Sequence, residues 1–282
     1  MARRAVLIGI NDYAMQNADL RGCVNDVRNL QTLLGEVYGF TDDEIVTLED
    51  GAATQAAMQA AIADLVTSAC PGDTLLLHYS GHGSHVADTS GDESDGRDEI
   101  LCPHDMNWDA PFLDDWLRTA LDQLPDGADL TVVMDCCHSG SNTREIPRPD
   151  APLQRYLPNP LLDEAEPVLR AAVPASAPAS GRSRRGRRRR GSADVHEVDI
   201  TETLITGCRD DQTSADAPID GTFHGALTYH LVSAVRELGP DASFRQVHAR
   251  TLELLKGRFT QVPQLEGRAA NLDRPFLARA AD

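Results

Sequence analysis

The chain has 282 residues, a hydrophobic fraction of 41% and a formal net charge of −18. This length is enough to bury a sizeable core, and no run approaches the roughly 18 apolar residues that span a bilayer. The acidic balance repels nucleic acid and favours cationic partners, so we expect neither nucleic-acid nor membrane partners.

The first apolar stretch, residues 5–10, follows two arginines. It is too short for a signal peptide and has no small-residue cleavage site, so we interpret it as a strand and expect a cytoplasmic protein. None of the six cysteines forms a Cys-x-x-Cys pair. The cysteines therefore lack the spacing of zinc ligands. A chain of this length with so few cysteines is not expected to depend on disulfides, so we predict reduced thiols.

Apolar runs alternate with amphipathic segments along the chain. Strands are predicted, in order, at residues 5–10, 44–48, 74–79, 99–103, 130–134 and 202–208. Helices are predicted at residues 25–37, 54–69, 113–124, 226–238 and 244–257. A short last strand is predicted at either 264–266 or 275–277. This alternation predicts an α/β fold in three layers, with a mostly parallel central sheet and helices on both faces.

The pattern fails between about residues 142 and 193, which are rich in Pro, Ala, Ser and Arg. Such a segment buries too little apolar surface to offset the entropy lost on ordering. We therefore predict a large catalytic subdomain over residues 1–142, a disordered linker over 143–194 and a small subdomain over 195–282.

A histidine and a cysteine follow two of the predicted strands. His82 comes just after residues 74–79, and Cys137 just after residues 130–134. If these strands are parallel neighbours, their carboxyl ends share one edge of the sheet, where ligands bind in open α/β folds. A thiol beside an imidazole is suited to attack an acyl carbon, with His82 taking the thiol proton and returning it to the leaving amine. His138 is the competing base, but His82 is preferred because it lies on a different strand and can face the sulfur.

Several short segments resemble the metacaspases, the arginine- and lysine-specific relatives of caspases. They are GCVND (22–26), YSGHGS (79–84), DGRDE (95–99), DCCHSGS (135–141), ITGCRDDQTSADA (205–217) and QVPQLEG (261–267). The resemblance covers the chain except the linker and implies a caspase-like fold and a cysteine endopeptidase. It identifies the nucleophile as the cysteine directly before His-Ser-Gly, Cys137, with Cys136 turned to the opposite face. The caspase-type motif QACxG is absent, so aspartate specificity is not implied.

The backbone N–H groups of Gly83 and Cys137 are the candidate donors to an oxyanion, the kind of interaction that stabilises the transition state of acyl transfer. The resemblance further assigns a pocket for a basic side chain to Asp135, Asp26, Cys23 and Ser80. Two aspartates can hold a guanidinium in this way. Asp135 could instead cap a helix and Asp26 could be a first-turn charge. The pocket predicts protein or peptide substrates that are cut after Arg or Lys.

Acidic residues crowd the loop before residue 100 and the start of the next helix. Many metacaspases are activated by calcium, which binds six to eight oxygen ligands, and the resemblance places its site at Asp98, Asp114 and Asp115, with Glu99 less well matched. Asp114 and Asp115 could instead simply favour a helix N-terminus. We expect Ca²⁺ as an activating ion, no organic cofactor and, by the same resemblance, a monomer. In the small subdomain, Asp210, Asp211 and Asp216 could add negative potential or serve turns and caps.

The linker carries an arginine tract at residues 182–190. Its members are Arg182, Arg184, Arg185, Arg187, Arg188, Arg189 and Arg190. The tract could be a nucleic-acid or membrane tether, a solvated linker, or a substrate of the enzyme itself. We favour self-cleavage within it. Two further functions stay open: a catalytically silent caspase-like scaffold that binds a basic partner, and a Cys–His acyl hydrolase or transferase without peptidase activity.

Overall fold

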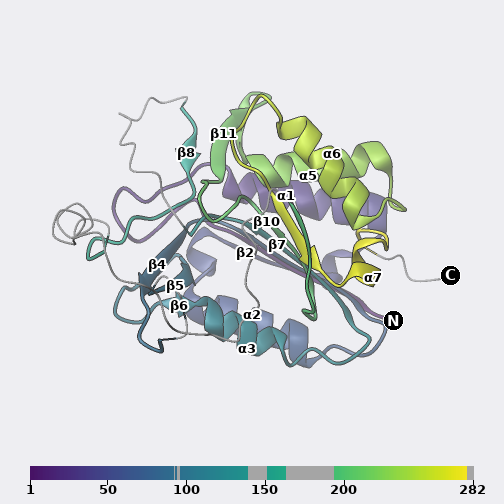
Figure 1. Cartoon of the computed structure of the whole chain (residues 1–282), viewed down its shortest axis with the longest axis horizontal. Coiled ribbons are helices and arrows are strands. Elements are labelled where there is room, and N and C mark those ends of the chain that lie inside the picture. Colours follow the sequence, from purple (N-terminus) through teal and green to yellow (C-terminus); the bar gives the residue numbers. More distant parts are fainter. Residues whose placement is uncertain (92, 94–95, 139–150, 163–193, 278–282) are drawn as a thin grey trace, which may run out of the picture.

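A computed structural model describes residues 1–91, 93, 96–138, 151–162 and 194–277. At its centre is a seven-stranded sheet in the order β2-β1-β3-β7-β10-β13-β9 (Figure 1). The first five strands in this order are parallel to one another, and β13 and β9 run in the opposite direction. The strands are β1 (Arg3–Gly9), β2 (Ile45–Glu49), β3 (Thr74–Ser80), β7 (Asp129–Asp135), β9 (Val195–Glu197), β10 (Thr203–Thr206) and β13 (Gln264–Gly267).

Helices cover both faces of this sheet (Figure 1). The helices α1 (Cys23–Leu33), α5 (Ala226–Leu238) and α6 (Phe244–Leu255) pack on one face, and α2 (Gln55–Thr67) and α3 (Asp114–Leu121) pack on the other. Side chains alternate along β1 accordingly: Ala5 and Leu7 face the first group of helices, while Val6 and Ile8 face the second. This period of two is the one that a strand buried on both faces requires. The arrangement confirms the predicted three-layer α/β class.

The remaining elements of the layers are short. A π-helical turn (Leu34–Tyr38) extends α1, and the turns Asp42–Glu44 and Asp50–Ala52 flank β2, while α7 (Ala269–Leu272) follows β13. The predicted last strand at 264–266 is therefore confirmed, and residues 275–277 contribute only a single bridge from Pro275 to Ser243. No helix in the described part of the chain is long and apolar enough to cross a membrane.

Two small antiparallel sheets flank the central one. The strands β4 (Gly83–Ala87), β5 (Arg97–Leu101) and β6 (Phe112–Leu113) form one of them, and β12 (Thr222–Gly225), β11 (Ala215–Ile219) and β8 (Leu153–Gln154) form the other. The strand predicted at 99–103 is thus β5, which lies outside the central sheet. A parallel neighbour needs a crossover of a dozen or more residues, commonly a helix. The described residues between β3 and β5 form β4 instead, with which β5 pairs directly.

Residues 151–162, which the sequence assigned to the linker, correct that prediction. Here β8 pairs with β11, Tyr156 forms a bridge with Gly83, and the side chain of Arg155 has no exposed surface. Composition did not predict this order, because buried carboxylates and backbone pairing stabilise the segment in addition to the apolar side chains of Tyr156 and Leu157. The arginine tract at residues 182–190 lies outside the described residues.

Candidate active site

Two neighbouring strands bring the predicted site residues to one edge of the sheet. The strands β3 and β7 pair in parallel along their whole length, and their last residues, Ser80 and Asp135, lie opposite each other. His82 follows β3 by two residues, and Cys137 follows β7 by two residues. Because both residues lie two positions beyond paired strand ends, the segments that carry them lie side by side.

Main-chain contacts fix the orientation of His82. Its backbone N–H donates to the hydroxyl of Tyr13 at 2.8 Å, and the hydroxyl of Tyr79 donates to its carbonyl at 2.6 Å. The ring Nε2 lies 2.8 Å from the carbonyl of Ala18 and must carry the hydrogen, since a carbonyl only accepts. Nδ1 therefore has a lone pair, and it is buried without a hydrogen-bond partner among the described residues.

Burial lowers the pKa of His82 to about 4, although its contact with the Ala18 carbonyl acts in the opposite direction. The imidazole is therefore neutral at physiological pH. A neutral ring with an unpartnered Nδ1 is in the form that a general base requires.

Cys137 is buried against the chain segment that carries His82. A Cβ atom on Gly83 would collide with the carbonyl of Cys137, so only glycine allows this approach. The Cys137 thiol accepts a hydrogen bond from the backbone N–H of Ser214 and contacts the thiol of Cys208. Within the described residues, no hydrogen bond joins Cys137 Sγ to His82. The two segments are thus adjacent, while each side chain has its own partners.

The two candidate oxyanion donors converge on a single atom. The N–H groups of Gly83 and Cys137 donate to the carbonyl oxygen of Arg155 at 3.0 and 3.1 Å. The N–H of Arg155 donates in turn to the carbonyl of Ser214 at 3.0 Å. The peptide group of Arg155 is therefore held in the position that a substrate carbonyl would occupy between two N–H donors.

The guanidinium of Arg155 fills a pocket that has no exposed surface. Its Nη2 lies 2.8 Å from Asp26 Oδ2 and 3.1 Å from Asp216 Oδ1. Its Nη1 lies 2.7 Å from Ser80 Oγ and 3.3 Å from Asp135 Oδ2. A buried guanidinium needs several acceptors in a fixed geometry, and this pocket supplies three carboxylates and a hydroxyl.

The structure thus brings together the residues that were predicted to form the pocket, and adds a third carboxylate. Cys23 is also buried here, within hydrogen-bonding reach of Ser80, and burial raises the pKa of its thiol despite the nearby Arg155. Burial acts to raise the pKa of Asp26, but the charge of Arg155 and the hydrogen bonds from His224, Arg155 and Ser80 together outweigh it, and the pKa is lowered. Burial keeps the pKa of Asp216 raised. Of the roles left open for Asp216, negative potential at the site is the one the structure assigns.

The N-terminus of α5 holds Asp135 in place. Its Oδ2 accepts from the N–H and the hydroxyl of Thr228, each at 2.8 Å, and its Oδ1 accepts from Ser214 Oγ at 2.6 Å. The capping role considered for Asp135 and its contact with Arg155 therefore coexist. Gly225 forms the wall of the pocket, where a Cβ atom would collide with the Asp135 carboxylate and the Arg155 guanidinium.

Sequence reasoning missed the residues that hold the far side of the cleft. Gln261 Nε2 donates to Ser214 Oγ at 3.1 Å and to the carbonyl of Gly207 at 2.8 Å, and its Oε1 accepts from the N–H of Ala215 at 2.9 Å. Ser214 and Gln261 both lie in segments already noted for the family resemblance. The only indication of their role in the sequence was that each is a polar residue within one of these segments. Arg155 had no such signal, because it lies among prolines.

The residues predicted to bind calcium lie on β5 and at the start of α3. Burial, followed by the repulsion from Glu99, raises the pKa of Asp114 to about 6. Asp98 is buried on β5, and Asp115 follows Asp114 in the first turn of α3. In the described ranges, no three His, Cys, Asp or Glu side chains are grouped closely enough to hold a metal ion. The carboxylates as they stand do not make a complete calcium site.

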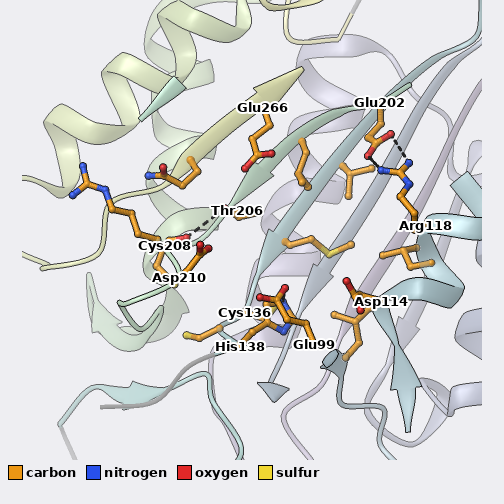
Figure 2. Close-up of a pocket in the computed structure, with 18 of the residues that line it drawn as sticks. Glu99, Asp114, Arg118, Cys136, His138, Glu202, Thr206, Cys208, Asp210 and Glu266 are labelled. Atoms are coloured by element: carbon orange, nitrogen blue, oxygen red, sulfur yellow. Dashed lines mark hydrogen bonds and ion pairs between the residues drawn. The ribbon is translucent and has the colours of Figure 1, made fainter. Parts of the chain in front are cut away.

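A cavity of about 780 Å³ opens beside Cys137 on the α3 side of the sheet. Figure 2 shows Cys136, His138 and Glu99 together at one end of it and the Arg118–Glu202 ion pair at the other. His138 Nε2 lies 3.8 Å from Cys136 Sγ and 3.9 Å from Glu99 Oε2. The competing base therefore faces Cys136 and the cavity.

Comparisons with known proteins bear on this site. Residues 3–144 match the family model of the metacaspase, peptidase C14 domain. Metacaspase-1 of Pyricularia oryzae is 35% identical over 289 residues, which cover 93% of this chain and 71% of that protein. Metacaspase-1A of Neurospora crassa is 34% identical over 286 residues, which cover 93% of this chain and 62% of that protein. The chain thus spans roughly two thirds of the length of these relatives.

Solved structures share the fold. A crystal structure of a Geobacter sulfurreducens protein superposes with a TM-score of 0.69 at 27% identity, covering 99% of this chain and all of that one. Caspase-1 from Spodoptera frugiperda superposes with a TM-score of 0.55 at 12% identity, covering 94% of this chain and 90% of that one, and shows the fold alone. The family-model match and the sequence identities establish that the chain belongs to the metacaspase family of cysteine-type peptidases.

Proposed function

We propose that this protein is a cysteine endopeptidase that cleaves after Arg or Lys, with Cys137 as nucleophile and His82 as general base. The observation that carries the proposal is the position of Arg155. Its side chain lies among three carboxylates, and its carbonyl accepts from the N–H groups of Gly83 and Cys137. The carboxylates that would select a basic side chain and the N–H groups that would stabilise the oxyanion therefore bind the same residue.

In the proposed mechanism, His82 Nδ1 accepts the thiol proton of Cys137, and the sulfur adds to the carbonyl carbon of the basic residue. The N–H groups of Gly83 and Cys137 stabilise the resulting oxyanion. The C–N bond then breaks as His82 donates its proton to the leaving amine. Water adds to the thioester and releases the carboxylate product. The hydrogen bond from His82 Nε2 to Ala18 keeps the ring in the tautomer that this sequence of steps needs.

Two observations favour this function over the alternatives. A scaffold that merely bound a basic partner would need the carboxylates, but would have no use for two N–H donors aimed at the carbonyl of the bound residue. A hydrolase or transferase acting on other acyl groups would have no use for a buried triad of aspartates. The cleft has both features, and both contact the same residue.

Turnover of four matched peptides tests the specificity. The peptides differ only at the residue before the cut, which is Arg, Lys, citrulline or Asp. We expect Arg to be cleaved fastest and Lys more slowly, because Lys cannot bind bidentately. Citrulline, which has the shape of Arg without the charge, should lose at least about 30-fold, since a buried charge pair is worth 2 kcal/mol or more. Preference for Asp, or equal rates for Arg and citrulline, would contradict the proposal.

We further propose that calcium binds at Asp98, Asp114 and Asp115, with Glu99 beside them, and stimulates activity. The support is the raised pKa of Asp114, about 6, which reflects burial and the neighbouring Glu99 carboxylate. A divalent cation would relieve this repulsion. Since these carboxylates do not make a complete site as they stand, binding must bring further oxygen ligands to them.

Calcium titration of the wild type and of Asp114→Asn, followed by thermal unfolding and by peptide turnover, tests this proposal. In the wild type we expect calcium to raise both the Tm and the rate, and in Asp114→Asn we expect at least a 10-fold weaker response. The exposed Asp126→Asn is the matched control. A wild-type rate that is the same in excess chelator and in calcium would remove the requirement.

The remaining expectations stay predictions. Self-cleavage within the arginine tract concerns residues outside the described ranges. The cytoplasmic location and the monomeric state are the others, and light scattering of the purified chain would decide the oligomeric state.

A further inference from the structure

A histidine lies on an apolar face of β3, where packing alone would favour an aliphatic side chain. Leu76 packs in the core against α1 and α5, and His78 follows it on the same face of the strand. Its neighbours across the sheet, Leu7 and Val133, belong to the same core. His78 has no exposed surface, and burying an imidazole costs free energy unless its N–H is hydrogen-bonded. This position therefore needs a polar partner.

The partner of His78 is Thr228, in the first turn of α5. His78 Nε2 lies 3.2 Å from Thr228 Oγ1, and both residues are fully buried. Thr228 Oγ1 lies in turn 2.8 Å from Asp135 Oδ2. A carboxylate only accepts, so the one hydroxyl hydrogen of Thr228 is donated to Asp135. Thr228 Oγ1 therefore accepts from His78, and Nε2 carries the hydrogen of the ring.

The His78 ring is neutral and has a single N–H. Burial lowers its pKa to about 4, although the carboxylates of Asp26 and Asp135 act in the opposite direction. The other ring nitrogen, Nδ1, is buried and has no hydrogen-bond partner among the described residues. A buried acceptor without a partner costs stability, so an aliphatic side chain would serve the core better than this ring does. The contact through Nε2 is what distinguishes the histidine.

The hydrogen bonds of His78 and Thr228 form a chain that ends at the acidic pocket. Both donors point toward Asp135, whose Oδ2 lies 3.3 Å from the guanidinium Nη1 of Arg155. Hydrogen bonds in such a chain polarise one another where water is excluded. The N–H of His78 also keeps the Thr228 hydroxyl in place. A ring nitrogen without hydrogen there would accept the hydroxyl hydrogen and compete with Asp135 for it.

We propose that His78 is a positioning residue for the acidic pocket, acting through the Thr228 hydroxyl to hold Asp135 in the geometry that selects a basic side chain. The inference rests on the proposed function, because the pocket is taken to receive the basic residue of the substrate. The imidazole acts through two intervening side chains, so its loss should weaken selection without stopping the chemistry. Two histidines of one segment thus have separate roles, His82 in the reaction and His78 in selection.

The ratio of kcat/KM for the Arg and citrulline peptides tests this role, because the ratio cancels any change that affects both peptides alike. His78→Leu removes the N–H, and Thr228→Val removes the hydroxyl but keeps its shape. We expect the ratio to fall at least about threefold in His78→Leu and at least about tenfold in Thr228→Val, since a hydrogen bond to a charged group is the stronger of the two. His78→Gln and Thr228→Ser keep a donor and should retain the ratio within about twofold.

The double variant His78→Leu/Thr228→Val shows whether the histidine acts through the threonine. Once the Thr228 hydroxyl is gone, His78→Leu should change the ratio by less than about twofold. Equal effects of His78→Leu in both backgrounds would overturn the proposal, and so would an unchanged ratio in His78→Leu alone. The matched controls are His248→Leu and Thr251→Val, which each remove a buried hydrogen bond from α6 and should leave the ratio unchanged.

The tautomer of His78 can be measured in the wild-type chain. Nitrogen-15 shifts of the histidine rings, with the His78 signals assigned by their loss in His78→Gln, should show a neutral ring with its hydrogen on Nε2 between about pH 6 and 8. A hydrogen on Nδ1, or a protonated ring in this range, would overturn the proposal. This measurement and Thr228→Val decide the question even if His78→Leu fails to fold.

The outcomes separate this inference from the function on which it rests. Wild-type protein that prefers Arg to citrulline, with the same preference in His78→Leu, would overturn the role of His78 alone. Wild-type protein that hydrolyses neither peptide, or both at equal rates, would overturn the proposed function and the inference with it.

Discussion

Cys137→Ala should abolish hydrolysis of Arg peptides, whereas Cys136→Ala should retain most of it. Cys137 supplies one of the two N–H donors that hold the Arg155 carbonyl, and the proposed mechanism assigns the attack to its sulfur. Cys136 packs in the core with Val132 and Met134, and burial raises the pKa of its thiol, which suppresses the reactive thiolate. We expect a loss of roughly 10⁴-fold or more for Cys137→Ala, because groups that act as one catalytic unit are lost together.

The adjacent cysteines make this comparison well controlled, since both variants remove one buried sulfur from the same turn. Initial rates on an Arg peptide, with thermal unfolding to confirm that each variant folds, provide the measurement. Labelling by a thiol-reactive peptidyl-arginine probe should follow the same pattern. Activity that survives in Cys137→Ala and disappears in Cys136→Ala would reverse the assignment and point to the Cys136–His138 pair instead.

Asp135→Asn should remove most of the preference for arginine. Asp135 Oδ2 lies 3.3 Å from Arg155 Nη1, and both side chains are fully buried. Removing one charge of a buried, hydrogen-bonded pair costs about 2–5 kcal/mol. Since 1.36 kcal/mol is a factor of ten, kcat/KM for an Arg peptide should fall by roughly 30- to 5000-fold. The rate on the citrulline peptide should change far less, because that substrate carries no charge to be paired.

The ratio of kcat/KM for Arg and citrulline peptides is the measurement, since a general loss of folding lowers both rates alike. The matched control is Asp211→Asn, an exposed aspartate at the rim of the neighbouring cavity, which should leave the ratio within about threefold. If Asp135→Asn lowers both rates equally, Asp135 supports α5 and the cleft but does not select the substrate.

Much of this site could be predicted from the ends of two strands. An apolar run followed by Ser-Gly-His-Gly, and another followed by Asp-Cys-Cys-His, placed His82 and Cys137 at one edge because parallel neighbours end together. The register of β3 and β7, with Ser80 opposite Asp135, bears out that reasoning in detail. The layers were equally predictable, since the period of the apolar residues distinguishes strand from helix.

What could not be predicted depends on contacts between residues far apart in the sequence. Arg155 lies among prolines, and only the assembled pocket from Asp26, Asp135 and Asp216 explains why a charged side chain there is fully buried. Asp216 lies on β11, but the sequence around it is polar, and a turn role was equally consistent with that sequence. The strand predicted at 99–103 is present as β5, but its place in a separate sheet could not be predicted, because local pattern indicates that a segment is extended and not which partner it pairs with.

Gly83 contacts the bound segment on both sides of the Arg155–Tyr156 bond. Its N–H donates to the Arg155 carbonyl, and its carbonyl accepts from the N–H of Leu157. Gly83 therefore fixes the register of this segment at two points, the carbonyl of Arg155 and the N–H two residues later. A chain displaced by one position would satisfy neither contact, and a proline two residues after the basic side chain would leave the Gly83 carbonyl without a donor. Under the proposed function, backbone register as well as charge would therefore set which bond is broken.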